Sequence, residues 1–345
     1  MVRVLLTGGA GYIGSHTAKA LAKCGYEPIV LDDFSTGHRW AVQWGPVAEG
    51  NVGDPVLLRR VLLEHRIGAV IHFAANAYVG DSMTDPRKYF HNNIVNTLTL
   101  FDAMLRADVR RIVFSSTCAT YGIPECVPIT EEHAQRPVNP YGESKLFIER
   151  ALKWYGEAYG LKWVTLRYFN AAGADPDGDL GEVHTPETHL IPLVLDTALS
   201  NRPSVEIYGT DYPTPDGTAI RDYVHVSDLA AAHTAALQYL EVGGTSTAIN
   251  LGTGCGHSVR QVIATAEQVT GRVISTHNCA RRAGDPAVLV AQVRKAPEIL
   301  EWHPKFSDLQ TVLTTAWDWH LSRKKKAKSA IRKADDQYAL RRIAV

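Results

Sequence analysis

The stretch Thr7–Gly14, TGGAGYIG, decides the fold of this 345-residue chain. It directly follows a short apolar run, VRVLLT (2–7), and opens an amphipathic stretch that predicts a helix over 12–24. Its glycines, Gly8, Gly11 and Gly14, have the spacing G-x-x-G-x-x-G. Glycines at these positions permit a tight turn and let backbone N–H groups approach a pyrophosphate at the helix N-terminus. A strand, a glycine loop and a helix in this order predict a dinucleotide-binding unit.

Two carboxylates close the second apolar run, PIVLDD (28–33). Asp32 and Asp33 stand 18 and 19 residues after Gly14. Carboxylates at the end of a second strand bond the ribose hydroxyls of an adenosine and repel a 2′-phosphate. A glycine pattern alone could mark an ordinary turn, but together with these carboxylates it favours NAD over NADP.

Short apolar runs alternate with longer helical patterns through the first 170 residues. Further strands are predicted at 69–75, 111–117 and 163–170, and further helices at 54–65, 87–107 and 141–159. Strands that are almost entirely apolar are typical of a parallel sheet covered on both faces. The alternation predicts a Rossmann-like, doubly wound α/β fold.

The alternation of short apolar runs and helical patterns stops after residue 170, which predicts a second, smaller lobe. Residues 171–224 are rich in Gly, Pro and Asp, with one helical pattern near 189–200, and a further helix is predicted at 228–241. The strand pattern TAINLGTG (247–254) indicates that residues 225–254 return to the sheet. We therefore expect an NAD-binding Rossmann domain at 1–170, a substrate-binding lobe built from 171–224 and 255–320, and a tail at 321–345.

The stretch NPYGESK (139–145) predicts a helix start, because a proline there opens a good helix pattern. Tyr141 and Lys145 are four residues apart, so they share one helix face. Lowering a tyrosine pKa by about three units needs about 4 kcal/mol. An ammonium about 5 Å away supplies about 3 kcal/mol at an effective dielectric of about 20, and the positive nicotinamide of NAD⁺ acts in the same direction.

A hydroxyl at the end of the preceding strand, Thr117 or Ser116, could complete such a proton relay. A Tyr-x-x-x-Lys pair alone is common on exposed helices. Combined with the glycine loop and the Ser/Thr strand end, it indicates an NAD-dependent interconversion of a ketone and an alcohol.

Composition and cysteine usage are ordinary for a globular enzyme, with 45% apolar and 21% charged residues. No stretch approaches the roughly 18 uninterrupted apolar residues of a membrane span. The N-terminus enters a strand at once and lacks a secretory cleavage pattern, and the five scattered cysteines lack CxxC spacing. We expect a cytoplasmic protein with reduced thiols, no metal and no membrane partner.

The net charge of zero hides a basic tail. Residues 323–345 hold nine Lys or Arg against two Asp, so 9 − 2 gives +7, and residues 1–322 carry −7. Such a tail could bind an anionic surface or nucleic acid. A solvated extension is the simpler interpretation, and since nothing else resembles a nucleic-acid module, no nucleic-acid partner is expected.

Several motifs together resemble the extended short-chain dehydrogenase/reductase family, and within it the UDP-glucose 4-epimerases (UDP-galactose 4-epimerases). They are TGGAGYIG, SSTCATYG (115–122), NPYGESK, LRYFNAAGA (166–174), YGTDYPTPDGTAIRDYVHV (208–226), NLGTGCGHSV (250–259) and RRAGD (281–285). The resemblance runs from residue 1 to about 320 and leaves out only the basic tail. It implies inversion at carbon 4 of a UDP-sugar through a 4-keto intermediate, with NAD retained.

The resemblance also implies roles for individual residues. Tyr141 is the base, Lys145 holds the nicotinamide ribose and lowers the tyrosine pKa, and Thr117 is the hydroxyl partner. The implied cofactor contacts are Gly8, Gly11, Tyr12, Ile13, Gly14, Asp32, Asp33, Asn51, Val52, Phe73, Ala74, Ala75, Asn92, Ser115, Tyr141, Lys145 and Phe169. The implied substrate contacts are Thr117, Asn170, His189, Leu190, Tyr208, Arg221, Arg282 and Asp285, of which the arginines suit a diphosphate.

The chain departs from the family pattern at four positions near the implied cofactor and substrate contacts. Asn51 replaces a frequent Asp near the adenine, and Ala77 replaces a Lys that some relatives place near the cofactor phosphates. His189 stands where an Asn is common. Leu289 is intermediate between the bulky Tyr of some relatives and the small residue of those that accept N-acetylated sugars, so the physiological sugar stays open.

Other functions fit part of the pattern. A 4,6-dehydratase needs a carboxylate pair after the Thr, and Cys118-Ala119 supplies none. A UDP-pentose or UDP-N-acetylhexosamine 4-epimerase would use the same catalytic residues, whereas an NAD-sensing protein without catalysis would not need Tyr141, Lys145 and Thr117 together. By resemblance, we expect a homodimer through helices 87–107 and 141–159. Their apolar residues could equally be core, namely Leu98, Phe101, Leu105, Phe147, Ala151 and Trp154.

Overall fold

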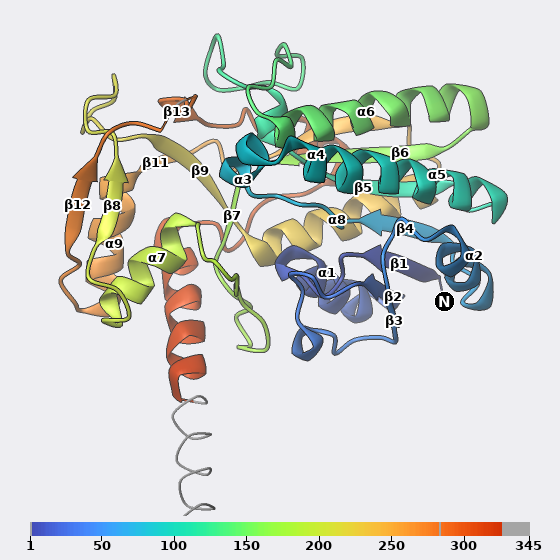
Figure 1. Ribbon diagram of the computed structural model, residues 1–345, viewed down its shortest axis with the longest axis horizontal. Coiled ribbons are helices and arrows are strands. Elements are labelled where there is room, and N and C mark those ends of the chain that lie inside the picture. Colours follow the sequence, from blue (N-terminus) through green and yellow to red (C-terminus); the bar gives the residue numbers. More distant parts are fainter. Residues whose placement is uncertain (1, 283, 326–345) are drawn as a thin grey trace, which may run out of the picture.

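A computed structural model describes residues 2–282 and 284–325 (Figure 1). Its largest sheet has seven parallel strands in the order β10-β6-β5-β4-β1-β2-β3. Their bounds are β1 (Arg3–Thr7), β2 (Glu27–Asp32), β3 (Val47–Glu49), β4 (Ala69–His72), β5 (Arg111–Thr117), β6 (Lys162–Tyr168) and β10 (Thr247–Leu251). The predicted doubly wound parallel sheet is therefore confirmed.

Helices connect these strands and cover both faces of the sheet. They are α1 (Tyr12–Lys23), η1 (Arg39–Ala41), α2 (Pro55–Glu64), α3 (Val79–Thr84), α4 (Pro86–Tyr89), the π-helix η2 (Phe90–Val95), α5 (Asn96–Arg106), η3 (Cys118–Thr120), α6 (Pro140–Tyr159), α8 (Val226–Glu241) and α10 (Lys295–Leu300). The helix predicted over 87–107 is thus three consecutive segments with a change of helical pitch in the middle.

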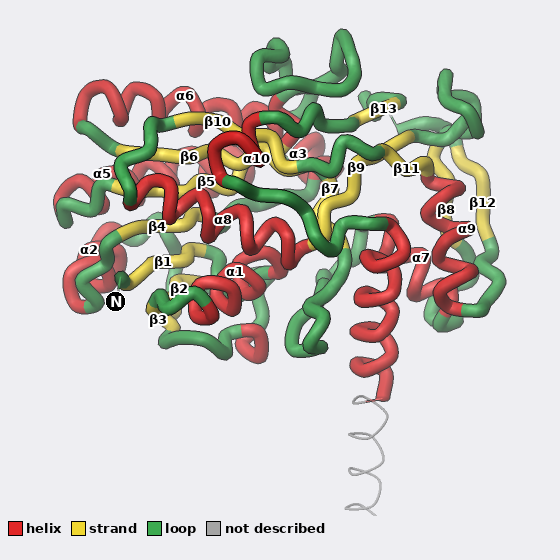
Figure 2. Tube along the Cα trace, turned by 180° about the vertical axis from the view of Figure 1, so that it is seen from behind, coloured by secondary structure: helices red, strands yellow, loops and turns green. Residues whose placement is uncertain are grey.

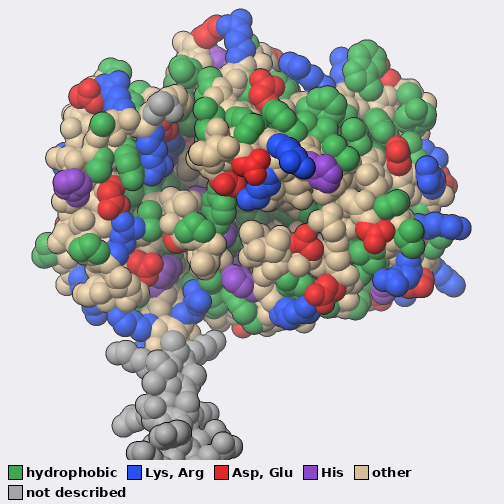
Figure 3. All heavy atoms as spheres, viewed as in Figure 1, with side chains coloured by type: hydrophobic (Ala, Val, Ile, Leu, Met, Phe, Trp, Pro, Cys, Tyr) green, Lys and Arg blue, Asp and Glu red, His purple; other side chains and the backbone are tan. Residues whose placement is uncertain are grey.

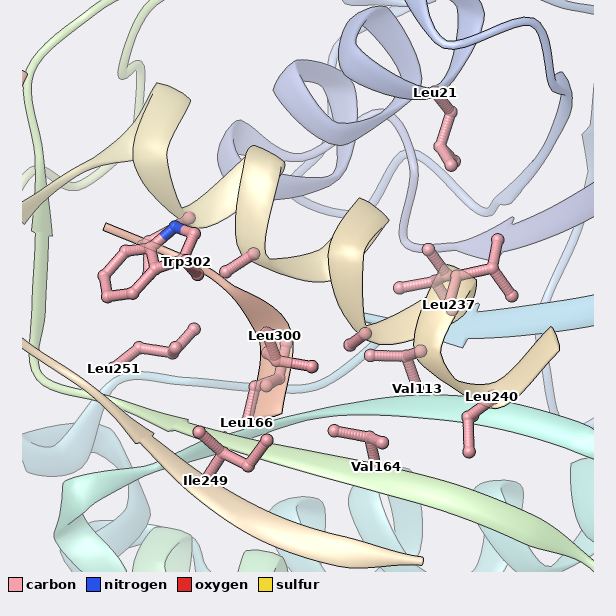
Figure 4. Packing of buried hydrophobic residues seen from close by; sticks show 14 of the residues in the cluster. Leu21, Val113, Val164, Leu166, Leu237, Leu240, Ile249, Leu251, Leu300 and Trp302 are labelled. Carbon is pink, nitrogen blue, oxygen red and sulfur yellow. The ribbon is translucent and has the colours of Figure 1, made fainter. Parts of the chain in front are cut away.

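The sheet is held by two apolar cores, one on each face. On one face, Leu21 of α1 and Leu237 of α8, both labelled in Figure 4, belong to the same buried cluster as Val4 and Leu6. On the other face, α2, α5 and α6 pack against Leu5 and its neighbours. Successive residues of β1 enter opposite cores, as the alternation of side chains along a strand requires. Figure 2 shows α1, α8 and α10 together on the side seen from behind.

Smaller sheets lie at the carboxyl ends of the main strands. One contains β7 (Asn170–Ala172), β9 (Ile220–His225), β11 (Gly256–Ser258) and β13 (Val288–Leu289), and another pairs β8 (Val205–Tyr208) with β12 (Thr276–Cys279). A third core joins α7 (Leu190–Ala198), α9 (Val259–Thr270) and the helical residues 309–325. The domain boundaries at 170, 224 and 255 stay predictions, and most of the basic tail lies outside the described residues.

None of the helices in the described part of the chain has the length and apolar character needed to span a lipid bilayer.

Candidate active site

The glycine loop between β1 and α1 has no room for side chains at two of its glycines. Gly8 has φ +71°, and a Cβ there would lie 2.6 Å from the backbone nitrogen of Ala74. A Cβ on Gly14 would lie 2.4 Å from the Gly8 carbonyl oxygen. Gly11 is the N-cap of α1, and no side chain caps this helix end. The first backbone N–H groups of α1 therefore keep their capacity to bind an anion, which fits a dinucleotide.

The carboxylates after β2 stand beside this loop. Asp32 is buried and accepts hydrogen bonds from the backbone nitrogens of Ala10 and Phe34, both at 2.9 Å. Burial raises the pKa of Asp32, while these two N–H groups oppose the rise. Asp33 accepts a hydrogen bond from Asn51 Nδ2 at 2.9 Å. The residues predicted for the adenosine end are thus brought together.

Helix α6 positions Tyr141 and Lys145 at the carboxyl end of β5. Asn139 caps the helix by accepting a hydrogen bond from the backbone nitrogen of Gly142 at 2.8 Å, with Pro140 in its first turn. Both predicted side chains are buried. Lys145 Nζ donates to the carbonyl oxygen of Ser115 at 2.8 Å, and Thr117 ends β5. The three residues predicted for catalysis are therefore side by side.

Four of the predicted substrate residues form two pairs near β9. Arg221 and Asp285 are joined by an ion pair. The guanidinium of Arg282 lies 4.0 Å from the ring centroid of Tyr208 at the end of β8. Figure 3 shows several Lys and Arg side chains on the left part of this face, where Figure 1 shows β8 and β12, and others over the rest of the face. Asn170 is in register with Tyr223, two residues after Arg221 on β9.

His189 has a different environment from these pairs. It precedes Leu190, the first residue of α7, and its Nδ1 lies 2.8 Å from Glu182 and 3.2 Å from Glu187. His184 faces the same two carboxylates at 3.2 and 3.4 Å. Although burial acts to lower the pKa of His189, Glu182 and Glu187 outweigh it and raise the pKa to about 10.

The remaining predicted cofactor positions line the same edge of the sheet or its neighbourhood. The backbone nitrogens of Phe73 and Ala74 donate to the carbonyl oxygen of Thr7 at 2.9 and 3.0 Å, next to the glycine loop. Tyr12 donates a hydrogen bond to the Gly173 carbonyl at 2.6 Å. The others are Ile13 in α1, buried Val52, Ala75 after β4, Asn92 in η2, Ser115 in β5 and buried Phe169.

A sequence model of the NAD dependent epimerase/dehydratase family matches residues 4–252. The chain belongs to this family. The resemblance inferred from the motifs is thereby confirmed.

The relatives of this epimerase/dehydratase family member include UDP-glucose 4-epimerases. That of Rhizobium leguminosarum bv. trifolii is 50% identical over 317 residues, which cover 92% of this chain and 97% of the relative. The crystal structure of UDP-glucose 4-epimerase from Brucella ovis in complex with NAD is 51% identical, with a TM-score of 0.90, and the match covers 92% of this chain and 98% of that one. An enzyme from Stenotrophomonas maltophila, solved with bound NAD and formylated UDP-arabinopyranose, is 36% identical, with a TM-score of 0.91 and coverage of 94% and 100%.

Burial dominates the acid–base properties of the epimerase/dehydratase site. It raises the pKa of Tyr141 well above its ordinary value, and the Thr117 side chain acts to lower it. Burial also lowers the pKa of Lys145 to about 7, against the opposing charge of Glu149. The expectation that the Lys145 ammonium depresses the tyrosine pKa stays a prediction.

The structure separates the two hydroxyls that the sequence left as alternatives. Ser116 Oγ donates to Glu149 at 2.6 Å in the interior, so it is occupied there. Thr117 accepts a hydrogen bond from the backbone nitrogen of Ala119 at 3.1 Å and is the hydroxyl on the side of Tyr141. Adjacent residues of a strand point to opposite faces, which is why only one of the two can serve the site.

Sequence reasoning missed the residues that hold α6 in place. Glu149 is buried and forms an ion pair with Arg167 of β6 at 2.6 Å. Ser144 Oγ donates to the Tyr141 carbonyl at 2.7 Å and accepts a hydrogen bond from Asn93 at 3.0 Å. One signal was available, since Glu149 follows Lys145 by four residues and so shares its helix face.

Proposed function

We propose that this protein interconverts UDP-glucose and UDP-galactose by inverting carbon 4 of the sugar through a 4-keto intermediate, with NAD held throughout the cycle. The observation that supports the proposal is that Thr117, at the carboxyl end of β5, lies beside Tyr141 and Lys145 in the first turns of α6. The glycine loop at the same edge of the sheet leads into a helix whose N-terminus no side chain caps. NAD, when bound, supplies a reversible acceptor for the hydride of carbon 4.

The residues of the chain have separate tasks in this proposal. Tyr141, as a phenolate, takes the proton of the C4 hydroxyl and later returns it, and Thr117 holds the same oxygen through its hydroxyl. Lys145, whose Nζ donates to the Ser115 carbonyl at 2.8 Å, would hold the nicotinamide ribose and, as an ammonium, lower the pKa of Tyr141. Arg221 and Arg282 anchor the diphosphate, so the sugar beyond it can present either face.

Replacement of Tyr141 by Phe tests the proposal. It should abolish the interconversion of UDP-glucose and UDP-galactose, measured without added reductant, while NAD and UDP still bind with nearly unchanged affinity. Near-normal turnover in Tyr141→Phe would overturn the role of this residue. Turnover that requires added NADH would point to a net redox reaction instead.

A UDP-pentose or UDP-N-acetylhexosamine 4-epimerase remains the second candidate, because of the position of Leu289. This residue of β13 is in register with Arg221 of β9 and packs against the core around Tyr121 and Phe169. A medium-sized side chain beside a proposed diphosphate contact leaves several sugars possible. Side-by-side turnover of UDP-glucose, UDP-N-acetylglucosamine and UDP-xylose decides among them, and no turnover of any would favour an NAD-sensing protein.

We propose that the protein is a cytoplasmic homodimer that pairs through α5 and α6. Phe147 is 47% exposed and Trp154 is 65% exposed, seven residues apart on one face of α6. Phe101 is fully buried, and Leu98 and Ala151 pack against the core beneath the sheet. The exposed aromatic pair is thus what a partner would cover, whereas the other three belong to the core of the subunit.

A further inference from the structure

Glu182, His184, Glu187 and His189 place four potential metal-ligand atoms within 4.8 Å of one another. All four side chains come from one short loop that ends at the start of α7. Glu182 is 6% exposed and Glu187 is 14% exposed, so both carboxylates are largely removed from water. Two acids in such a place require positive charge beside them.

The four separations between a histidine nitrogen and a carboxylate oxygen in this cluster are near the edge length of a tetrahedron around a metal ion, with Glu187 using Oε2 toward His184 and Oε1 toward His189. The Nδ1 atoms of the two histidines lie 2.8 to 3.4 Å from the carboxylate oxygens. A tetrahedral zinc ion with bonds of about 2.0–2.2 Å has ligand–ligand edges of about 3.3–3.6 Å. The shortest separation, between His189 Nδ1 and Glu182 Oε1, would therefore have to open by about 0.5–0.8 Å to admit the ion, and the other three by at most about 0.4 Å.

Hydrogen bonding accounts for only part of this cluster. The Nδ1 atom of His184 is buried and has no hydrogen-bond partner among the described residues, although two carboxylate oxygens lie within 3.4 Å. Glu187 Oε1 is oriented by the backbone nitrogens of Thr188 and His189, at 2.8 and 2.9 Å. Such supporting hydrogen bonds are typical of the carboxylates in metal sites.

A second acidic cluster provides a contrast within the same molecule. Asp175, Asp177 and Asp179 also converge, but Lys19 Nζ lies 2.6 to 2.8 Å from all three. An ammonium already balances that group. No lysine or arginine of the described chain forms an ion pair with Glu182 or Glu187, whose only such partners there are His184 and His189.

We propose that Glu182, His184, Glu187 and His189 form a four-coordinate site for a divalent transition-metal ion, with Zn²⁺ as the ion that fits best. Imidazole ligands disfavour Mg²⁺ and Ca²⁺, which select oxygen, and a tetrahedral arrangement favours Zn²⁺ over Cu²⁺ or Ni²⁺. Four protein ligands leave no open position, so the ion is structural and takes no step in the proposed reaction.

The site would tie the start of α7 to the glycine loop. The ring of Tyr12 meets His184 edge-on at 6.4 Å, and Tyr78 packs against both histidines. Trp319 Nε1 donates to the Glu182 carbonyl at 3.3 Å, which joins the helix at 309–325 to the same loop. Because the ion uses Nδ1 of His189, the other ring nitrogen is left for the predicted substrate contact.

Zinc content and stability test the proposal on the full chain, prepared with NAD and without a polyhistidine tag. After dialysis against a chelator and return of Zn²⁺, the wild type should hold one zinc per chain by mass spectrometry of the metal and unfold at a higher temperature than the stripped protein. His184→Gln and Glu187→Gln should each weaken zinc binding more than about tenfold. His303→Gln, which changes an exposed histidine, should bind zinc like the wild type.

Cobalt provides a measurement that needs no variant. Co²⁺ bound to the unaltered protein should give the intense visible absorption of tetrahedral coordination, and X-ray absorption should report two nitrogen and two oxygen neighbours. A wild type that holds no zinc overturns the proposal, because protons on the histidines then balance the carboxylates. Equal zinc content in the wild type, His184→Gln and Glu187→Gln also overturns it, since the five free cysteines or other groups would then be the ligands.

Discussion

At the scale of single residues, the adjacent Ser116 and Thr117 have different roles, one in the interior and one in the candidate site. Ser116 Oγ donates to buried Glu149 at 2.6 Å, whereas Thr117 faces Tyr141. The two hydroxyls therefore form a matched pair in which each is a control for the other.

Thr117→Val should reduce kcat by a factor of about 10²–10⁴, because the reacting oxygen loses a hydroxyl partner in the proton relay. Ser116→Ala should leave kcat within a few-fold of normal but lower the free energy of unfolding by about 1.5–3 kcal/mol, as expected for a hydrogen bond to a charged group. Steady-state kinetics and urea unfolding of both variants check this. The reverse pattern would assign the catalytic hydroxyl to Ser116.

At the scale of elements, α6 is fixed to the sheet by one buried ion pair. Glu149 and Arg167 each retain 7% of their side-chain exposure, and Arg167 also donates to Tyr121 at 2.9 Å and to the Glu131 carbonyl at 3.1 Å. The helix that carries Tyr141 and Lys145 is thus oriented by charge as well as by apolar packing.

Arg167→Leu should lower the free energy of unfolding by about 3–5 kcal/mol, since it leaves the Glu149 carboxylate buried without its partner. Arg110→Leu removes a guanidinium whose ion pair with Asp108 is exposed, and it should cost much less. Both values come from denaturant titrations. If the two substitutions cost the same, the buried pair does not anchor α6.

Elements with a strong local pattern could be predicted from the sequence. Six strands of the main sheet and most helices from α1 to α8 follow from apolar runs, glycine turns and the Asn139-Pro140 cap, whereas α3 (Val79–Thr84) was not predicted. The strand β3 was not predicted because its three residues, Val47–Glu49, are too few to show a pattern. They form a strand by pairing with β2.

The candidate site was predictable only in part, for a related physical reason. Tyr141, Lys145 and Thr117 belong to local motifs, so they could be predicted as candidates from the sequence. The Glu149–Arg167 pair and the contacts of His189 with Glu182 depend on how distant or irregular segments pack, and no spacing rule specifies that packing. The raised pKa of Tyr141 likewise follows from burial, which the sequence does not quantify.

At the scale of the whole molecule, buried neutral histidines set the response to acid. Burial lowers the pKa of His72 to about 3 and those of His16, His225 and His233 to about 4. Below their ordinary pKa of about 6.5, the unfolded chain binds protons that the folded chain refuses. The stability these groups provide is present above pH 6.5 and is lost as the pH falls toward 4.

The free energy of unfolding, measured by urea titration from pH 7.5 to 5, should therefore decrease steadily below pH 6.5, by up to about 1.4 kcal/mol per pH unit for each such histidine. Replacing His72, which bonds Thr7 and Thr97 at 2.6 and 2.8 Å, by Asn should make the decrease shallower. A stability that is level between pH 6.5 and 5 would contradict the assignment of these histidines as neutral.

Association of two subunits belongs to the same scale. Trp154→Glu places a charge on the exposed face of α6 and should convert the dimer to a monomer at micromolar concentration, as measured by sedimentation. Val242→Glu, at an 85% exposed site at the end of α8, is the matched control and should not change the mass. A wild type that sediments as a monomer would contradict the proposed interface.

The position of α8 and β10 in the chain has a consequence for biosynthesis. Residues 1–168 supply six strands, but much of the apolar face that α1 leaves open is covered by residues 226–251. At about 5–20 residues per second, the ribosome needs about 4–17 s to make the 83 residues that separate Tyr168 from Leu251. During that interval the nascent sheet presents a bare apolar surface and the free edge of β6. The full chain should therefore depend on chaperones while it is being translated, and a fragment ending at residue 170 should aggregate.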